Sequence, residues 1–235
     1  MKLAFQIAWR FLASAKRQTL IIVLGISVGV SVQVFIGSLI TGLQKSLVDS
    51  TIGSSSHITV INETESEFID DYLAKMDMIA STSEQIGVVS PVLDLGGILE
   101  KGELKKEVLY RGFDINLANE IYAFEMKLTE GSGLPVEIND IILGVGLKNE
   151  LSLEIGNTID IDILGNMRTL TVVGFFDFNV AVINRSWGVG IIETLQDIVG
   201  DTNKVSSIEM QIKDVFEAEN LSLALDVTLA SEGLK

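Results

Sequence analysis

Between Thr19 and Leu43 the chain carries no charged residue, and most of these positions are Ile, Val, Leu, Phe or Gly. At about 1.5 Å per residue the run would extend roughly 37 Å, enough to cross a hydrocarbon core of about 30 Å with some tilt. A cleaved signal peptide has a shorter apolar core, of about 7–15 residues, ending in small residues. The pattern therefore predicts a transmembrane helix over residues 19–43.

Small or polar residues recur at every fourth position of this run, which aligns them along one side of a helix. Small residues let a second helix approach closely, and a Gln in mid-membrane needs a hydrogen-bond partner there. The spacing predicts that the helix packs against other transmembrane helices through Gly25, Gly29, Gln33, Gly37 and Thr41.

The segment before the span, residues 1–18, has an amphipathic pattern. Leu3, Ile7 and Phe11 recur every four residues, which suits a helix lying along the inner membrane surface; a helical extension of the span fits the same residues. Lys and Arg cluster before the span, whereas Lys45 stands alone after it. The positive-inside rule then places the N-terminus in the cytoplasm and residues from about 45 outside the cytoplasmic membrane.

Beyond the span, two hydrophobic periods alternate. Period-two patterns predict strands at 57–62, 86–99, 103–113, 140–143, 158–163, 168–175, 186–192 and 205–212. Helical periodicity predicts helices at 66–79, 115–124, 146–153, 193–199 and 215–229. Turns are expected at Lys101-Gly102 and Gly165-Asn166, a bulge or turn at Gly96-Gly97, a loop at 131–135 and an irregular stretch before 186. The mixture predicts an α+β outer domain.

Charge is distributed unevenly between these parts. Residues 1–43 contain four basic residues and no acid, and the whole chain has a net charge of −15, so the remainder carries −15 − 4 = −19. Such an acidic domain repels phosphate backbones, which argues against nucleic-acid binding.

The residues that usually carry chemistry are sparse. Cys is absent, and the single His57 follows three serines and is expected to open a strand. No phosphate-binding Gly-rich loop followed by Lys occurs. The acid pairs Asp70-Asp71 and Asp160/Asp162 lack a third ligand and read as solvated side chains rather than a calcium site. We therefore expect no catalytic residue, no metal and no cofactor, and a non-enzymatic role.

Four segments resemble one family in order and spacing. They are A-W-R-F-L-A-S-A-K-R-Q-T-L-I-I-V-L-G-I-S-V-G-V (8–30), I-I-L-G-V-G-L-K-N-E-L-S-L-E-I-G-N-T-I-D-I (141–161) with L-T-V-V-G-F-F (170–176), I-I-E-T-L-Q-D-I-V-G (191–200), and V-S-S-I-E-M-Q-I-K-D (205–214). The chain thereby resembles ABC-transporter permeases of the MacB, FtsX and LolC/LolE type. The stretch 42–60 looks closest to the lipoprotein-releasing, LolC/LolE branch.

The resemblance implies a fold and an organisation. In that family an extracytoplasmic domain, with a porter-like α+β part and a strand-rich second lobe, is inserted between the first two of four transmembrane helices. We accordingly expect a MacB-like core domain at 44–235, with 44–113 and 201–235 forming the porter-like part and 114–200 the second lobe. The sequence would then stop before the last three helices.

The resemblance also implies partners: a cytoplasmic ABC ATPase, a second permease subunit in a homo- or heterodimer, membrane lipid, and a lipoprotein or periplasmic carrier. In the releasing branch, acyl chains would contact the outer half of the span at Phe35, Ile36, Leu39, Ile40 and Leu43. In the competing interpretation, these side chains face lipid or partner helices. Two alternatives stay open, a single-pass sensor or binding protein, and a macrolide- or peptide-exporting or cell-division type of permease.

Overall fold

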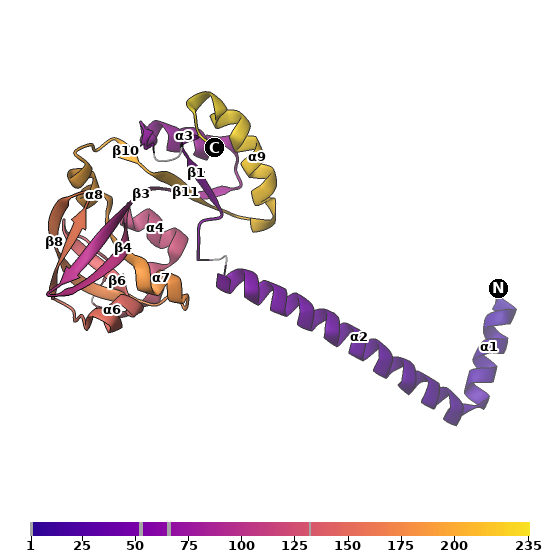
Figure 1. The fold of residues 1–235 in the computed structure, drawn as a ribbon. Helices are drawn as coiled ribbons and strands as arrows, with labels where there is room; N and C mark the ends of the chain where they lie inside the picture. The colour runs from indigo at the N-terminus through magenta and orange to yellow at the C-terminus, as the bar shows by residue number, and fades with distance from the viewer. Residues whose placement is uncertain (1, 52–53, 65–66, 132) are drawn as a thin grey trace. The chain divides into compact units, whose positions relative to one another are not determined.

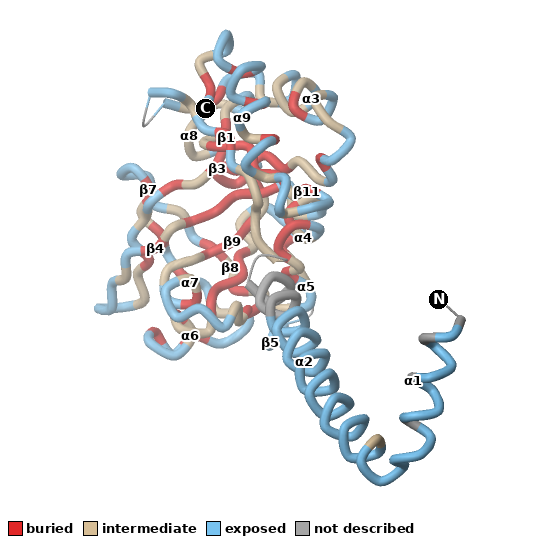
Figure 2. The backbone as a smooth tube through the Cα atoms, turned by 90° about the vertical axis from the view of Figure 1, so that its right-hand side faces the viewer, coloured by how far each residue is buried: buried red, intermediate tan, exposed pale blue. Residues whose placement is uncertain are grey.

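The computed structural model describes residues 2–51, 54–64, 67–131 and 133–235, and its contacts divide the chain into two units, Met1–Thr51 and Ile52–Lys235 (Figure 1). The first unit consists of helix α1 (Lys2–Ser14), a bend at Ala15 and helix α2 (Lys16–Thr51). Helix α2 contains the predicted span, and its described side chains are exposed along nearly the whole length (Figure 2).

The first part of the second unit is a three-stranded antiparallel arrangement covered by helices. Strand β1 pairs with β11, and β11 pairs with the first half of β3. A short ribbon, β2 with β10, lies beside it. The elements of this part are β1 (Ile58–Ile61), β2 (Ile69–Asp70), α3 (Tyr72–Thr82), β10 (Lys204–Val205), β11 (Ser207–Ile212) and α9 (Ala218–Leu229).

The second part is a closed barrel. Its strands pair in the ring β3–β4–β9–β6–β8–β7 and back to β3, so these six strands leave no open edge within the ring. Strand β5 (Leu128–Gly131) adds to β8 outside it. The ring strands are β3 (Ile86–Lys101), β4 (Leu104–Phe113), β6 (Asp140–Gly144), β7 (Thr158–Ile163), β8 (Asn166–Phe176) and β9 (Trp187–Ile191).

Short helices connect the barrel strands: α4 (Ile115–Tyr122), α5 (Phe124–Lys127), α6 (Val145–Leu151), α7 (Ala181–Ser186) and α8 (Ile192–Val199). Helix α4 begins at Asp114, whose carboxylate accepts bonds from the backbone N–H groups of Asn116 and Leu117, the usual way in which the first turn is capped. The hairpin β3–β4 reaches from the β11 ladder into the barrel, so both parts share it (Figure 1). The division into lobes by residue number stays a prediction.

The predicted α+β class is confirmed, and the alternation that predicted strand 158–163 is visible in the core. Ile159, Ile161 and Ile163 are buried in the larger of two apolar clusters, while Asp160 is exposed. The helix predicted over 66–79 is wrong before Tyr72, since Ile69 pairs with Val205 in β2; Ser66 lies outside the described residues. Helix α3 starts only after Asp71, which has a left-handed backbone.

Other local predictions need correction. The helix expected over 115–124 is broken at Ala123, whose φ of 53° ends α4 and starts α5. Gly131 belongs to strand β5 rather than to the loop expected at 131–135, and Ser132 of that loop lies outside the described residues. Helix α7 occupies part of the stretch expected to be irregular. Strand 205–212 is interrupted at Ser206, which separates β10 from β11.

Three predictions at glycines are also wrong. The β3–β4 turn uses Gly102 and Glu103 rather than Lys101 and Gly102, because Lys101 already pairs with Leu104. The β7–β8 turn uses Leu164 and Gly165 rather than Gly165 and Asn166, because Asn166 already pairs with Ile163. Gly96 and Gly97 are regular positions of β3 rather than a bulge or turn. At Gly97 a Cβ would come within 3.0 Å of the Asp162 carbonyl oxygen, so the lack of a side chain allows β7 to approach.

Candidate functional site

Helix α2 is the one helix in the described part of the chain that is long and apolar enough to cross a membrane. The qualifying stretch, Lys16–Leu43, has a mean hydropathy of 2.4 over its most apolar window, none of which is buried. Length and composition alone support this assignment. The predicted site residues all lie on this helix.

The small-residue stripe of α2 has no partner within its own unit. An added Cβ at Gly25, Gly29 or Gly37 would meet nothing within 4 Å. Thr41 donates its hydroxyl to the carbonyl of Gly37 at 3.0 Å, which satisfies that group within the helix. Since nothing in the unit requires these glycines to be small, the prediction that a second helix packs here stays a prediction.

The predicted acyl-contact residues lie on a different side of α2 from Gly37 and Thr41, the stripe positions at the same level of the helix. At about 100° per residue, the directions of the five residues fall within an arc of roughly 140°, and Gly37 and Thr41 point away from it. All five side chains are at least half exposed: Phe35, Ile36, Leu39, Ile40 and Leu43. The helix therefore presents an apolar face and a small-residue face at the same height.

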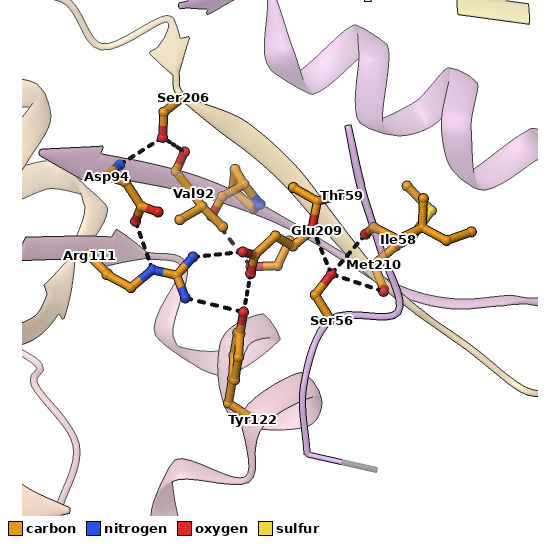
Figure 3. Close-up of polar contacts among 12 residues, drawn as sticks. Ser56, Ile58, Thr59, Val92, Asp94, Arg111, Tyr122, Ser206, Glu209 and Met210 are labelled. Carbon is orange, nitrogen blue, oxygen red and sulfur yellow. Dashed lines mark hydrogen bonds and ion pairs between the residues drawn. The ribbon is translucent and has the colours of Figure 1, made fainter. Parts of the chain in front are cut away.

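A second candidate site, which the sequence analysis missed, is a charge cluster inside the outer domain (Figure 3). Arg111 on β4 is only 4% exposed. Its Nε donates to Asp94 Oδ1 on the paired strand β3 at 2.9 Å, and its Nη2 donates to Glu209 Oε1 on β11 at 2.6 Å. Tyr122 of α4 donates its hydroxyl to Glu209 Oε2 at 2.6 Å. One guanidinium thus links three strands and a helix.

Aromatic rings complete the surroundings of this guanidinium. The Arg111 Cζ lies 4.3 Å from the ring centroid of Trp187 and 4.9 Å from that of Phe113. These rings belong to the smaller apolar cluster, in which Tyr122, Phe124 and Phe178 also contact one another. The cation is therefore held by carboxylates on one side and by π faces on the other, an arrangement suited to arginine rather than lysine.

Burial and charge shift the pKa values in this cluster. Burial raises the pKa of Asp94 above its ordinary value, although the Arg111 guanidinium works against the shift. Burial alone would lower the pKa of Arg111, but Asp94 and Glu209 more than compensate and raise it. Burial also raises the pKa of the Tyr122 hydroxyl, which therefore stays protonated and donates to Glu209. The cluster is a fixed cross-link between elements.

A sequence signal for this cluster exists. Asp94, Arg111 and Glu209 are single charges inside otherwise apolar strand segments, V-L-D-L, V-L-Y-R-G-F and S-I-E-M. A buried charge requires a partner of opposite charge, so the sequence alone could have predicted that this basic residue pairs with the two acidic residues. Within the described residues no group of three His, Asp or Glu side chains is placed to hold a metal ion.

The structure thus combines one long apolar helix with an α+β domain in which a closed barrel shares strand β3 with a three-stranded ladder. The family model described as the MacB-like periplasmic core domain matches residues 19–226, and the chain belongs to this family. The predicted resemblance to MacB/LolC-type permeases is thereby confirmed.

Curated relatives extend the match. The chain is 24% identical over 220 residues to the lipoprotein-releasing system transmembrane protein LolC of Xylella fastidiosa strain Temecula1, covering 88% of this chain and 52% of the relative. It is 22% identical over 244 residues to LolC of Neisseria meningitidis serogroup B, covering 93% and 57%. The chain therefore spans only about half the length of these relatives.

Solved structures share the fold. The extracellular domain of the noncanonic ABC-type transporter YknZ from Gram-positive bacteria aligns with a TM-score of 0.55 at 11% identity, covering 76% of this chain and 95% of that one. The periplasmic region of MacB from Actinobacillus actinomycetemcomitans aligns with a TM-score of 0.55 at 14% identity, covering 80% and 90%. At such identities the likeness establishes the fold of the outer domain only.

Proposed function

We propose that the chain is part of a permease subunit of an ABC exporter that releases lipoproteins from the outer face of the cytoplasmic membrane. The observation that carries this proposal is the match to LolC proteins along 88% of the chain; the match to the family model begins at residue 19 and so includes the apolar helix as well as the outer domain. The N-terminus lies in the cytoplasm, since the basic residues precede the span.

The proposed permease works with a cytoplasmic ATPase and a second permease subunit, homologous or identical. ATP-driven closure of the ATPase moves the permease helices, and the outer domain carries that motion to a lipoprotein and then to a periplasmic carrier. No catalytic residue or cofactor of this chain takes part.

In this proposal the backbone carries the motion from α2 to β1, and hydrogen bonds between strands carry it from β1 onward. Strand β1 begins seven residues after the end of α2 and is bonded to β11, which is bonded to β3. Strand β3 then continues into the barrel. Antiparallel ladders resist sliding, and the Arg111 cluster fixes β3, β4, β11 and α4 to one another, so a pull on β1 reaches the barrel.

Lipoprotein acyl chains in this proposal lie against Phe35, Ile36, Leu39, Ile40 and Leu43, while the small-residue stripe packs against a partner helix. The two faces favour this division of labour, because large apolar side chains contact an acyl chain well and glycines permit close helix approach.

A photo-crosslinking experiment in the full-length parent protein tests this proposal. A photoreactive residue replaces Leu39 on the acyl-contact face, and a control replaces Val28 in the inner half of the same helix. We expect a lipoprotein adduct at position 39, absent at 28 and absent with a non-acylated lipoprotein. Adducts of equal yield at both positions, or none at 39 while lipoproteins are released, would contradict the proposed contact.

A further inference from the structure

Helix α1 and the start of α2 form a surface that combines exposed apolar side chains with unpaired cations. Ile7, Trp9 and Phe11 are 57–79% exposed. Arg10 lies among them in sequence, and Lys16 and Arg17 follow the bend at Ala15. Figure 1 shows the bend between α1 and α2. No ion pair between described residues involves any of these three cations.

The surface is hollowed next to the bend. A depression of about 340 Å³ is lined by Ile7, Arg10, Phe11, Ser14 and Ala15. Its lining residues include the apolar Ile7 and Phe11, the cationic Arg10 and the hydroxyl-bearing Ser14. An apolar recess edged by a cation and a hydroxyl matches the boundary between an acyl chain and a phosphate headgroup.

Charge decides which lipid fits. Residues 1–43 contain no acid, so Arg10, Lys16 and Arg17 create a positive potential that nothing in their own segment cancels. A zwitterionic headgroup brings its own cation, which these residues repel, whereas an anionic headgroup brings only negative charge. We propose that the α1–α2 bend, through Arg10, Ser14, Lys16 and Arg17, binds anionic phospholipid in preference to zwitterionic phospholipid.

The charge of the remainder of the chain opposes the binding of anionic lipid. The segment after residue 43 carries a net charge of −19, being the total of −15 less the four cations of residues 1–43. That domain repels an anionic bilayer, so any enrichment of anionic lipid around the protein has to come from the N-terminal segment. The inference does not depend on what the permease transports.

Nanodiscs test the inference with the complete 235-residue chain. The protein is reconstituted in phosphatidylcholine mixed with phosphatidylglycerol, with bromine on the acyl chains of one lipid or the other, and quenching of Trp9 fluorescence is measured. The Trp9→Phe variant supplies the background from Trp187. Retained lipids are counted independently by native mass spectrometry.

We expect brominated phosphatidylglycerol to quench Trp9 more strongly than brominated phosphatidylcholine, and phosphatidylglycerol to be enriched among the retained lipids. Each neutralisation, such as Arg10→Gln, should lower the enrichment about fivefold, and Arg10→Gln/Lys16→Gln/Arg17→Gln should abolish it. A control with the same change of charge in the outer domain, Lys75→Gln/Lys105→Gln/Lys213→Gln, should leave the enrichment intact.

Three results would overturn the inference. Equal quenching by the two brominated lipids would show that the segment does not discriminate between headgroups. An equal loss of enrichment in the control variant would assign the effect to total charge. Abolition of the enrichment by excess inorganic phosphate at constant ionic strength would show a site for a small anion rather than for a lipid.

Discussion

Arg111 links strands β3, β4 and β11 of the outer domain through its buried guanidinium. Its charge is buried and is compensated by Glu209, which is equally buried, and by Asp94, whose side chain is 26% exposed. Removing one partner of a buried ion pair leaves an uncompensated charge, whereas removing a partly hydrated partner costs less because water replaces it. The two carboxylates should therefore respond differently to substitution.

Replacement of each carboxylate by its amide tests this difference. We expect Glu209→Gln to lower the free energy of unfolding by about 3 kcal/mol or more, since it weakens bonds to both Arg111 and Tyr122, and Asp94→Asn to change it by about 1 kcal/mol at most, since burial already disfavours the ionised form of Asp94. Urea denaturation of a fragment covering residues 54–235 measures both. Equal losses would show that the deeper burial of Glu209 does not separate the two carboxylates.

The raised pKa of Asp94 predicts a pH dependence of a definite sign. The folded state binds the Asp94 proton more tightly than the unfolded state does, so ionisation of this group works against folding. As the pH rises from 3.8 through the raised pKa, the wild type should lose stability relative to Asp94→Asn. Urea titrations of both proteins across this range give the difference; a difference that is constant or of the opposite sign would refute the assignment.

Leu164 is a strained residue at the tip of the β7–β8 hairpin. Its φ is 54° and that of Gly165 is 82°, the pattern of a turn with two left-handed residues, which favours Asn-Gly over Leu-Gly. The Leu164 side chain is 71% exposed and so gains little from packing. We expect Leu164→Asn to raise the free energy of unfolding by about 1 kcal/mol. A loss of stability instead would mean that the side chain has contacts worth more than the strain.

At the scale of elements, the seam between β3 and β7 closes the barrel, and two adjacent glycines differ in their part in it. A Cβ at Gly97 would lie 3.0–3.1 Å from atoms of Ile161, Asp162 and Ile163, whereas a Cβ at Gly96 would meet nothing within 4 Å. We expect Gly97→Ala to destabilise the domain by about 1–3 kcal/mol and Gly96→Ala to have little effect. Similar unfolding midpoints for the two variants would show that the seam can widen freely.

Element types were predictable where burial and sequence period agree. Strand β7 alternates strictly, so its class and its buried Ile159, Ile161 and Ile163 follow from the residues. The turn after it was misplaced because a Gly-Asn pair suggests a turn more strongly than Leu-Gly does, while the actual position depends on the pairing of Ile163 with Asn166. Helix α3 was started too early because pairing with Val205, remote in sequence, makes Ile69 a strand residue.

For the candidate sites too, local patterns could be predicted from the sequence and contacts between distant residues could not. The faces of α2 could be predicted from the spacing of residues, because small residues at every fourth position lie on one side of a helix. The Arg111 cluster is not predictable in this way because its members lie far apart along the chain; Glu209 is 98 positions from Arg111 in sequence. Which distant charges meet depends on strand order, and the ring β3–β4–β9–β6–β8–β7 mixes parallel with antiparallel neighbours. No local pattern specifies that order.

At the scale of the whole molecule, the chain joins one membrane helix to an outer domain of the MacB-like periplasmic core family. Our account is that the helix packs against other permease helices through its small-residue stripe and transmits motion from a cytoplasmic ATPase. Because every fourth residue on a helix advances by about 40°, the stripe winds around α2, which suits a partner helix that crosses it at an angle rather than lying parallel.

Recovery of partners with the full-length parent protein tests this account most directly. The tagged protein is purified from membranes in mild detergent, alongside Gly29→Leu/Gly37→Leu and a control, Val28→Leu, at a position of α2 outside the stripe. We expect an ABC ATPase and a permease subunit to co-purify with the wild type and with Val28→Leu, and the glycine variant to lose most of both. If no ATPase is recovered from the wild type even after gentle crosslinking, the permease account is wrong, and the chain is better described as a membrane-anchored binding domain.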